Sequence, residues 1–378
     1  MKRNKHEVCN MSSSADIGKI DSNLAVKNSL TEGMDIYSVD AENMELFGFY
    51  WRKPGEPLHR FPASMDMEFN QGVKNLSRCT AGGHLRFRSD ADCIKVHARV
   101  EGGRMSHMAF VGSRGFDLYV GKGQTQVFAK SSVMNQADDE YTAVLFQSPN
   151  RIMRDFTIYF PLYSEVKFVE IAVTAGARVE PPTPWQDNAP IVVYGTSITQ
   201  GGCVSRPGML YSNILSRLVK RPVYNFGFSG SGKGEAPIAH KLTEIADPAM
   251  YILDYDDNAH PDLLKETLLP FINILREKYP VVPILALSTE PKSAEAFEPF
   301  DSEYASKERG KYNAIHQEVQ DLLRQQGDDN VYFLDGRMLY GADFEECTVD
   351  GAHATDLGTY RTAHALAPLV ERILNRWW

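Results

Sequence analysis

The sequence of 378 residues contains no apolar run that approaches the ~20 residues of a membrane-spanning helix. It also lacks a surplus of positive charge, because its 49 acidic residues outnumber its 40 basic ones and leave a formal net charge of -9. Phosphate binding needs a clear basic excess, so the charge argues against a nucleic-acid partner. We therefore expect neither a membrane nor nucleic acid among the partners, while the oligomeric state, a homo-oligomer included, stays open.

Cysteine is scarce, and its positions show no close pairs. An odd and scattered set argues against a disulfide framework and against a zinc site, whose ligands would come at short paired spacings. We predict no metal and no cofactor. The cysteines are Cys9, Cys79, Cys93, Cys203 and Cys347.

The N-terminal segment, residues 1–44, is polar and has no defined pattern. Lys2, Arg3 and Lys5 are followed by no apolar core, which a secretory signal would require. We expect a cytoplasmic protein, or an exported one whose signal has been removed.

Residues 45–178 read as β-structure. Apolar residues occupy every second position in residues 93–100, and residues 156–160 and 169–173 repeat the alternation. A period of two is typical of half-buried strands, and no helical pattern interrupts the region. A β-sandwich or jelly roll is the predicted shape of this domain.

Residues 179–190 contain four prolines and are predicted to form a stiff linker. From residue 191 to 378 the pattern alternates between short apolar runs and helical stripes, which indicates a parallel sheet covered on both faces. Active sites of such sheets lie outside the carboxyl ends of the strands. The apolar runs are residues 191–194, 222–226, 250–253, 282–287 and 331–334.

Two distant segments could together supply a nucleophile and its base. Ser197 follows the first strand of the second domain on a turn opened by Gly195, and Asp350 and His353 follow the last strand. A serine is a poor nucleophile unless a base takes its proton, and a carboxylate holds that base in the right tautomer. Taken alone, Ser197 could equally be a turn or capping residue, and His353 a surface histidine.

A glycine-rich loop, residues 225–232, follows the second strand and could bring backbone N–H groups close to a developing oxyanion. A rival interpretation is a nucleotide-binding P-loop, because residues 227–233 match G-x-x-x-x-G-K and Asp254 ends a later strand. Such a loop needs Ser or Thr after the lysine, and this chain has Gly234 there.

Polar residues also follow the third strand. Asn258 could donate its amide N–H to an oxyanion, whereas Asp254, Asp256 and Asp257 could bind a cation or form a solvated loop. The residues alone do not decide between an oxyanion donor, a cation site and a solvated loop.

In this order and context, the segments resemble the four blocks of the SGNH (GDSL-type) hydrolases. Those blocks correspond here to Gly195-Thr196-Ser197, Gly230, Asn258 and Asp350-x-x-His353. Residues 80–83, 105–108 and 115–119 look like the GxDLY domain that precedes one bacterial branch of these enzymes. The resemblance covers about residues 45–378. It implies a flavodoxin-like three-layer domain over residues 191–378, preceded by the β-domain.

The resemblance also implies roles for these residues. Ser197 would be the nucleophile, His353 the base and Asp350 the group that orients it, while Ser197, Gly230 and Asn258 would form the oxyanion hole. Two positions depart from the family pattern. Thr196 stands where the superfamily usually has Asp, and Asp257 where this branch often has His.

The implied function is hydrolysis of small acyl esters, in the first place O-acetyl groups on carbohydrates, through an acyl-serine intermediate. Arg206, Asp254 and Asp256 are candidate substrate contacts that could equally be structural. An acyltransferase with the same triad, or a carbohydrate-binding protein with an inactive hydrolase domain, remains an alternative. Fold alone does not decide among them.

Overall fold

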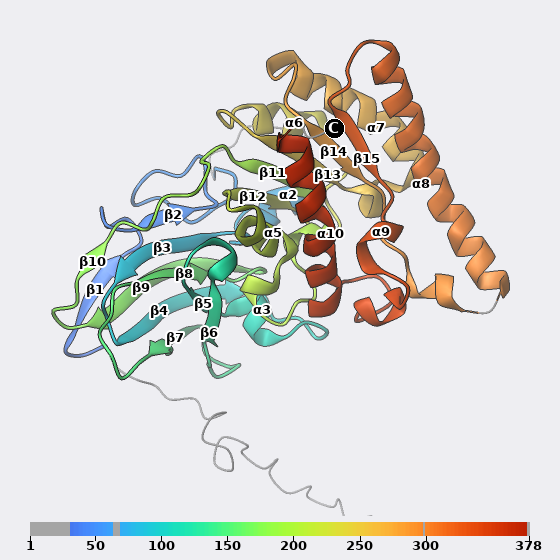
Figure 1. Ribbon diagram of the computed structural model, residues 1–378. Coiled ribbons are helices and arrows are strands. Elements are labelled where there is room, and N and C mark those ends of the chain that lie inside the picture. Colours follow the sequence, from blue (N-terminus) through green and yellow to red (C-terminus); the bar gives the residue numbers. More distant parts are fainter. Residues whose placement is uncertain (1–30, 63–68, 298, 376–378) are drawn as a thin grey trace, which may run out of the picture.

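The computed structural model describes residues 31–62, 69–297 and 299–375, and the structural statements below refer to these residues (Figure 1). Of the polar segment predicted for residues 1–44, residues 1–30 lie outside the described residues, and so does Cys9. The four described cysteines carry free thiols. No described helix is both long and apolar enough to span a bilayer.

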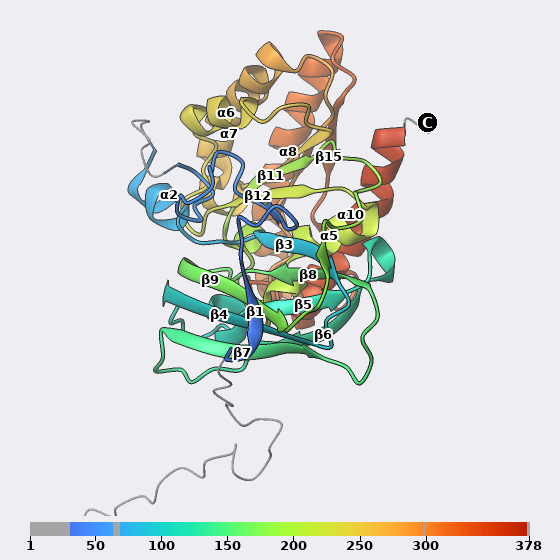
Figure 2. The same cartoon turned by 90° about the vertical axis from the view of Figure 1, so that its left-hand side faces the viewer.

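The N-terminal half consists of two antiparallel sheets packed face to face (Figures 1 and 2). The first has the order β1 (Met34–Ser38), β9 (Ser164–Thr174), β4 (Cys93–Gly102) and β7 (Glu140–Gln147). The second has the order β10 (Val179–Glu180), β3 (His84–Ser89), β8 (Arg154–Tyr159), β5 (Asp117–Val120) and β6 (Val127–Ser131). A further strand, β2 (Glu45–Phe47), pairs with β3. Two of these strands, β1 and β10, lie outside residues 45–178.

The alternating sequence pattern explains how this half folds. In β4, Ile94, Val96, Ala98 and Val100 are fully buried, whereas the residues between them are half-buried or exposed. Strands of this kind bury one face, and the two sheets enclose a common apolar core. The predicted β-sandwich is confirmed.

The C-terminal half is built on a parallel sheet with the strand order β12-β11-β13-β14-β15. These strands are β11 (Ile191–Gly195), β12 (Val223–Gly227), β13 (Met250–Asp254), β14 (Ile284–Leu287) and β15 (Val331–Leu334). Numbered within this half, the order is 2-1-3-4-5, which is the flavodoxin-like arrangement. The predicted α/β fold is confirmed.

Helices cover both faces of the parallel sheet (Figure 1). One face packs against α6 (Ala236–Thr243), α7 (Asp256–Lys278) and α8 (Pro299–Gln325). The other packs against α5 (Tyr211–Val219), α9 (Arg337–Tyr340) and α10 (Asp356–Asn375). The shorter elements are α2 (Gln71–Leu76), α3 (Phe110–Arg114), α4 (Ser197–Gln200), η1 (Gly123–Thr125), η2 (Pro207–Met209), η3 (Ser293–Ala296) and η4 (Phe344–Cys347).

A segment of the N-terminal half is part of the core of the α/β half. Phe61 and Phe69 are buried in the same apolar cluster as residues of the parallel sheet. The ring of Phe61 stacks on Phe226 and Phe228, at centroid distances of 5.1 and 5.4 Å. The two halves are therefore joined by a common apolar core.

Arg60 connects this segment to the glycine-rich loop, residues 225–232, by hydrogen bonds. Its side chain is fully buried, and its guanidinium donates to the carbonyl oxygens of Cys79 (2.9 Å), Leu76 (2.7 Å) and Gly227 (2.7 Å). Burial lowers the pKa of Arg60 to about 10, which leaves it charged at neutral pH. A buried cation surrounded by carbonyl oxygens is costly to remove, because the acceptors lose their donors.

We expect Arg60→Met to lower the free energy of unfolding by about 3–5 kcal/mol, because it leaves buried carbonyl oxygens without partners. Arg88→Met is the matched control. Arg88 is 37% exposed in its side chain, and among the described residues its one ion pair is with Glu180, at 3.4 Å, so its loss should cost at most ~1 kcal/mol. Urea unfolding of both variants measures the difference. Equal losses would contradict the structural role of Arg60.

Candidate active site

Ser197 stands on a tight turn between the first parallel strand and a short helix. Strand β11 ends at Gly195, where a Cβ atom would collide with the Thr199 hydroxyl and the Asp254 carbonyl oxygen. The hydroxyl of Thr196 accepts the backbone N–H of Ile198 (3.3 Å) and caps α4. Because Thr196 is the capping residue, the Ser197 hydroxyl remains available for another partner at the carboxyl edge of the sheet.

That partner is His353. The Ser197 Oγ lies 2.9 Å from His353 Nε2, and His353 Nδ1 lies 2.7 Å from an oxygen of Asp350. The structure thus brings together the three side chains predicted from two distant segments. Ser197 is buried, whereas the side chains of His353 and Asp350 are 32% and 37% exposed, so the chain of contacts runs from the surface to a buried hydroxyl.

The Asp350 carboxylate decides which nitrogen of His353 carries the proton. Although burial opposes its ionisation, the backbone N–H and imidazole of His353 and the N–H of Ala352 lower the pKa of Asp350 to about 2. An ionised carboxylate can only accept hydrogen bonds, so His353 Nδ1 must donate. In the neutral imidazole, Nε2 then has a free lone pair that accepts the Ser197 hydroxyl.

The predicted oxyanion donors Gly230 and Asn258 lie against each other. Gly230 adopts a positive φ of 65° in the turn after β12. When the Asn258 amide is oriented to satisfy both of its polar atoms, its oxygen accepts the N–H groups of Gly230 (3.3 Å) and Ser231 (3.1 Å). Asn258 is therefore held by the loop that the sequence predicted as its neighbour in the site.

The glycines of this loop are required by packing. A Cβ atom on Gly227 would collide with the backbone of α4 at Thr199 and Gln200, and one on Gly232 with the carbonyl of Gly195. Lys233, which the P-loop hypothesis would direct at a phosphate, is exposed. The close approach between this loop and the Ser197 turn explains the glycines without a bound nucleotide.

Two of the three predicted substrate contacts, Asp254 and Asp256, are buried carboxylates. The carboxylate of Asp254 accepts the hydroxyls of Thr199 (2.6 Å) and Tyr211 (2.8 Å), and burial raises its pKa to about 7. Asp256 is buried against the ring of His316, 2.9 Å away, and burial raises its pKa. Both carboxylates are buried and bonded to groups of the protein, which favours the structural alternative for them.

Arg206 belongs to the contact between the two halves. Its guanidinium donates to the fully buried carboxylate of Asp117 (2.8 Å) and to the hydroxyl of Tyr119 (2.6 Å). The same carboxylate accepts the N–H of Gly208 (2.9 Å). These contacts favour the structural alternative for Arg206, because it orders the chain that follows the Ser197 helix.

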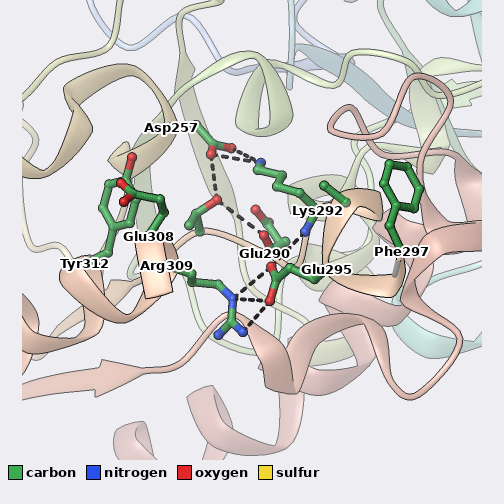
Figure 3. Close-up of a pocket in the computed structure, with 10 residues that line it drawn as sticks. Asp257, Glu290, Lys292, Glu295, Phe297, Glu308, Arg309 and Tyr312 are labelled. Carbon is green, nitrogen blue, oxygen red and sulfur yellow. Dashed lines mark hydrogen bonds and ion pairs between the residues drawn. The ribbon is translucent and has the colours of Figure 1, made fainter. Parts of the chain in front are cut away.

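A pocket of about 430 Å³ lies beside this site at the same edge of the sheet (Figure 3). Asp257, next to Asn258 in the chain, forms one wall and pairs with Lys292 (2.8 Å). Across the pocket, Arg309 pairs with Glu295, and Tyr312 and Phe297 add aromatic surface. The full lining is Asp257, Thr289, Glu290, Lys292, Ala294, Glu295, Phe297, Glu308, Arg309 and Tyr312.

The pocket is attached to the loop that carries the histidine. The backbone N–H of Ser293 donates to the carbonyl of Gly351 (3.2 Å), and its hydroxyl lies 3.1 Å from that of Thr348. Glu290 lies in the wall of the pocket, and burial raises its pKa well above the ordinary value. Its Oε1 atom is buried without a partner in the described residues.

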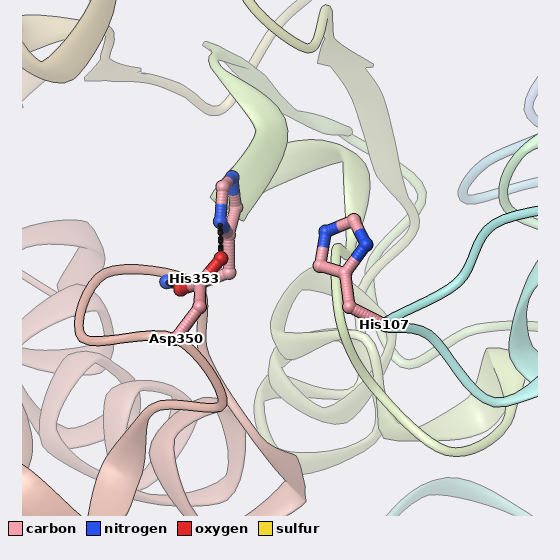
Figure 4. A group of neighbouring side chains, drawn as sticks. All are labelled: His107, Asp350 and His353. Carbon is pink, nitrogen blue, oxygen red and sulfur yellow. Dashed lines mark hydrogen bonds and ion pairs between the residues drawn. The ribbon is translucent and has the colours of Figure 1, made fainter.

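One residue at the site was missed by the sequence reasoning. His107, from the loop between β4 and α3, faces His353 with ring centroids 6.0 Å apart (Figure 4). It stands in the segment 105–108 that resembles the GxDLY domain, but no spacing in the chain connects it to His353. Only the packing of the two halves brings these rings together.

Comparison with known proteins agrees with this architecture. A model described as the GDSL-like lipase/acylhydrolase family matches residues 188–371, and a GxDLY model, described as the N-terminus of SGNH-hydrolase-type esterases, matches residues 34–179. A search of curated protein sequences finds no significant match.

Solved structures show a likeness over about nine tenths of the chain. A Bacteroides ovatus protein described as a GDSL-like lipase is 30% identical, with a TM-score of 0.81 over 90% of this chain and 98% of that one. A salicylyl-acyltransferase of a tetracycline biosynthetic pathway, SsfX3, is 18% identical, with a TM-score of 0.71 over 89% and 98%. An acetyl xylan esterase from the rumen bacterium Butyrivibrio proteoclasticus is 11% identical, with a TM-score of 0.54 over 91% and 100%.

The last two likenesses show the fold alone, whereas the first is close enough in sequence and coverage to show the family. The resemblance seen in the sequence is thereby confirmed. The chain belongs to the GDSL-like lipase/acylhydrolase family, in the branch that carries an N-terminal GxDLY domain.

Proposed function

We propose that the protein is a serine esterase that removes small acyl groups, O-acetyl above all, from carbohydrates. The observation that carries the proposal is the continuous hydrogen-bond chain from Asp350 through His353 to Ser197, with distances of 2.7 and 2.9 Å. Membership of an esterase family agrees with it. A nucleophile, a base and an orienting carboxylate in this geometry are suited to acyl transfer.

In the proposed reaction, Ser197 Oγ attacks the ester carbonyl carbon while His353 Nε2 takes the hydroxyl proton. The tetrahedral intermediate collapses to an acyl-serine as His353 returns that proton to the leaving alcohol. Water then attacks the acyl-serine carbonyl carbon and loses a proton to His353. This second tetrahedral intermediate breaks its bond to Ser197 Oγ as His353 returns the proton to that oxygen, and the acid is released. Asp350 remains ionised throughout and stabilises the imidazolium that forms in each step.

The oxyanion of both intermediates needs preorganised donors. We assign this role to the backbone N–H of Ser197 and the amide N–H of Asn258, with Gly230 as a third donor. With the Asn258 amide in the orientation that satisfies both of its polar atoms, the Gly230 N–H points at the Asn258 oxygen, 3.3 Å away. It therefore orients Asn258 first, and must leave that oxygen to donate to the intermediate.

The carbohydrate part of the proposal is supported by the pocket beside the site. Tyr312 and Phe297 offer ring surface, and the charged side chains around them are mostly paired, as in pockets that bind neutral polar ligands. An acetyl xylan esterase shares the fold. We infer that the pocket holds the sugar that carries the ester.

A second candidate is an acyltransferase, because SsfX3, titled a salicylyl-acyltransferase, aligns with this chain over 89% of its length. It would use the same acyl-serine but pass the group to an alcohol instead of water. Products of the reaction with an acetylated sugar plus an excess of a second alcohol separate the two. Free acetate alone supports hydrolysis, and an acetylated second alcohol supports transfer.

We expect Ser197→Ala and His353→Ala each to lower kcat for p-nitrophenyl acetate by about 10⁴-fold or more, because each removes a member of one catalytic unit. Circular dichroism should show unchanged folding. A fluorophosphonate probe should label the wild type at Ser197 and leave Ser197→Ala unlabelled. Undiminished turnover by folded Ser197→Ala would refute the mechanism, and an unlabelled wild type would favour an inactive sugar-binding protein.

Asp350→Asn should lower kcat by roughly 10²–10⁴-fold, because an amide does not hold His353 in the required tautomer. It should also change the pH dependence of stability. The pKa of Asp350 is lowered from 3.8 to about 2 on folding, so its contribution to stability is present above pH 4 and disappears as the pH falls through this range. The variant should therefore melt below the wild type at pH 7, and the gap should close toward pH 2.

Thermal melting of both proteins between pH 2 and 7 measures this effect. Glu318→Gln is the control, because Glu318 is an exposed carboxyl on α8 with no ion pair in the described residues. Its melting temperature should follow the wild type at every pH. A gap for Asp350→Asn that stays constant down to pH 2 would argue against an ionised Asp350.

Tyr312→Ala should raise KM for an acetylated oligosaccharide by about fivefold, equivalent to ~1 kcal/mol of lost ring contact, while leaving p-nitrophenyl acetate turnover unchanged. The small ester needs no sugar pocket. Tyr360→Ala, which removes a 49% exposed ring on α10, serves as the control. If both substrates respond alike, the pocket does not hold the sugar.

A further inference from the structure

Three potential metal ligands converge at the mouth of the site. His107, Asp350 and His353 each offer one ligand atom, and these atoms all lie within 4.8 Å of one another. Figure 4 shows the two rings facing each other, His107 from the loop after β4 and His353 from the loop before α10. The sequence predicted no metal site, and no spacing in the chain connects His107 to Asp350 and His353.

The donor set is suited to a borderline divalent cation. Two imidazoles and one carboxylate are ligands that Zn²⁺ accepts, and a tetrahedral ion with bonds of ~2.0–2.2 Å leaves its fourth position to water. Ligand atoms around such an ion lie on the order of 3.3 Å apart, so the widest separation must shorten by up to about 1.5 Å. His107 can make this movement, because it is exposed and forms no hydrogen bond within the described residues.

We propose that His107, Asp350 and His353 form a Zn²⁺ site that switches the esterase off reversibly. Both nitrogens of His353 are already in use, Nδ1 by Asp350 and Nε2 by Ser197. A metal ion requires the lone pair of one of them. If Nε2 binds the metal, Ser197 loses its base; if Nδ1 binds it, the tautomer held by Asp350 is lost. Metal binding and activation of Ser197 therefore exclude each other.

The site exists only where the two halves meet. His107 comes from the β-half, while Asp350 and His353 come from the loop that follows η4 in the α/β half. His107 has no part in the acyl-transfer steps proposed above, so it can be replaced without touching them. It is also the ligand that distinguishes this site from an ordinary triad, since the other two are present in any such enzyme.

Binding can be tested apart from activity, using the full-length Ser197→Ala protein and zinc chloride in a calorimeter. We expect one Zn²⁺ per chain, and the additional change His107→Ala should weaken binding by about tenfold or more. The additional change His240→Ala is the matched control, because it removes an exposed histidine of α6 and should leave binding unchanged. Equal affinity with and without His107 would overturn the proposed site.

The inhibitory role rests on the proposed function and has a separate test. Zn²⁺ should stop p-nitrophenyl acetate turnover by the wild type, and a chelator should restore it. His107→Ala should turn over normally without metal and tolerate about tenfold more Zn²⁺. Zn²⁺ binding that needs His107 but leaves turnover intact would overturn the switch. A wild type that binds Zn²⁺ through His107 yet hydrolyses no ester would sink the esterase proposal and leave the metal site standing.

Discussion

The geometry of the candidate site depends on one ionised carboxylate, that of Asp350. Three N–H groups donate to it, two from the backbone and one from the His353 ring, and together they hold its pKa near 2. Because the carboxylate accepts two backbone N–H groups of its own loop, the same interaction shapes the loop and orients the ring. Gly351 makes this turn with a φ of 89°, a value that side-chain-bearing residues rarely adopt. A single local contact therefore sets the tautomer, the ring position and the path of the chain.

The other side of the site depends on packing between the two halves. Arg60 and Phe61 from the β-half contact the strand and loop that lead to Gly230, and the hydroxyl of Tyr163 donates to the carbonyl of Ser197 (3.3 Å). Asp117 holds the chain after α4 through Gly208. These contacts are buried, so they are little screened by water and salt. The β-half is thus a structural support of the Ser197 turn, whatever its role toward substrate.

Features of the fold and the site that depend on residues close together in the chain could be predicted from the sequence, whereas those that depend on distant residues could not. Alternation in β4 and short apolar runs followed by helical stripes are local patterns, and they predicted the sandwich and the parallel sheet. Ser197, Asp350 and His353 were predictable as candidates because parallel strands deliver their carboxyl ends to one edge. Asp254, Asp256 and Arg206 lie near that edge too, but whether such a side chain faces a substrate or a buried partner depends on long-range packing. The buried partners are Thr199, His316 and Asp117. No spacing in the chain predicts these pairings.

Asp257 illustrates how the surroundings of the site can compensate for a departure from the family pattern. Burial opposes ionisation of this carboxyl, but Lys292, the Thr289 hydroxyl and the nearby His353 lower its pKa. The residue is therefore anionic beside an imidazole that becomes a cation whenever it takes the Ser197 proton, and it favours that cation. Lys292 neutralises part of its charge, so the pair contributes a weak field and an ordered wall instead of a second strong carboxylate. An anionic Asp257 is therefore compatible with the triad. A fixed positive charge at this position would repel the His353 imidazolium at every proton transfer.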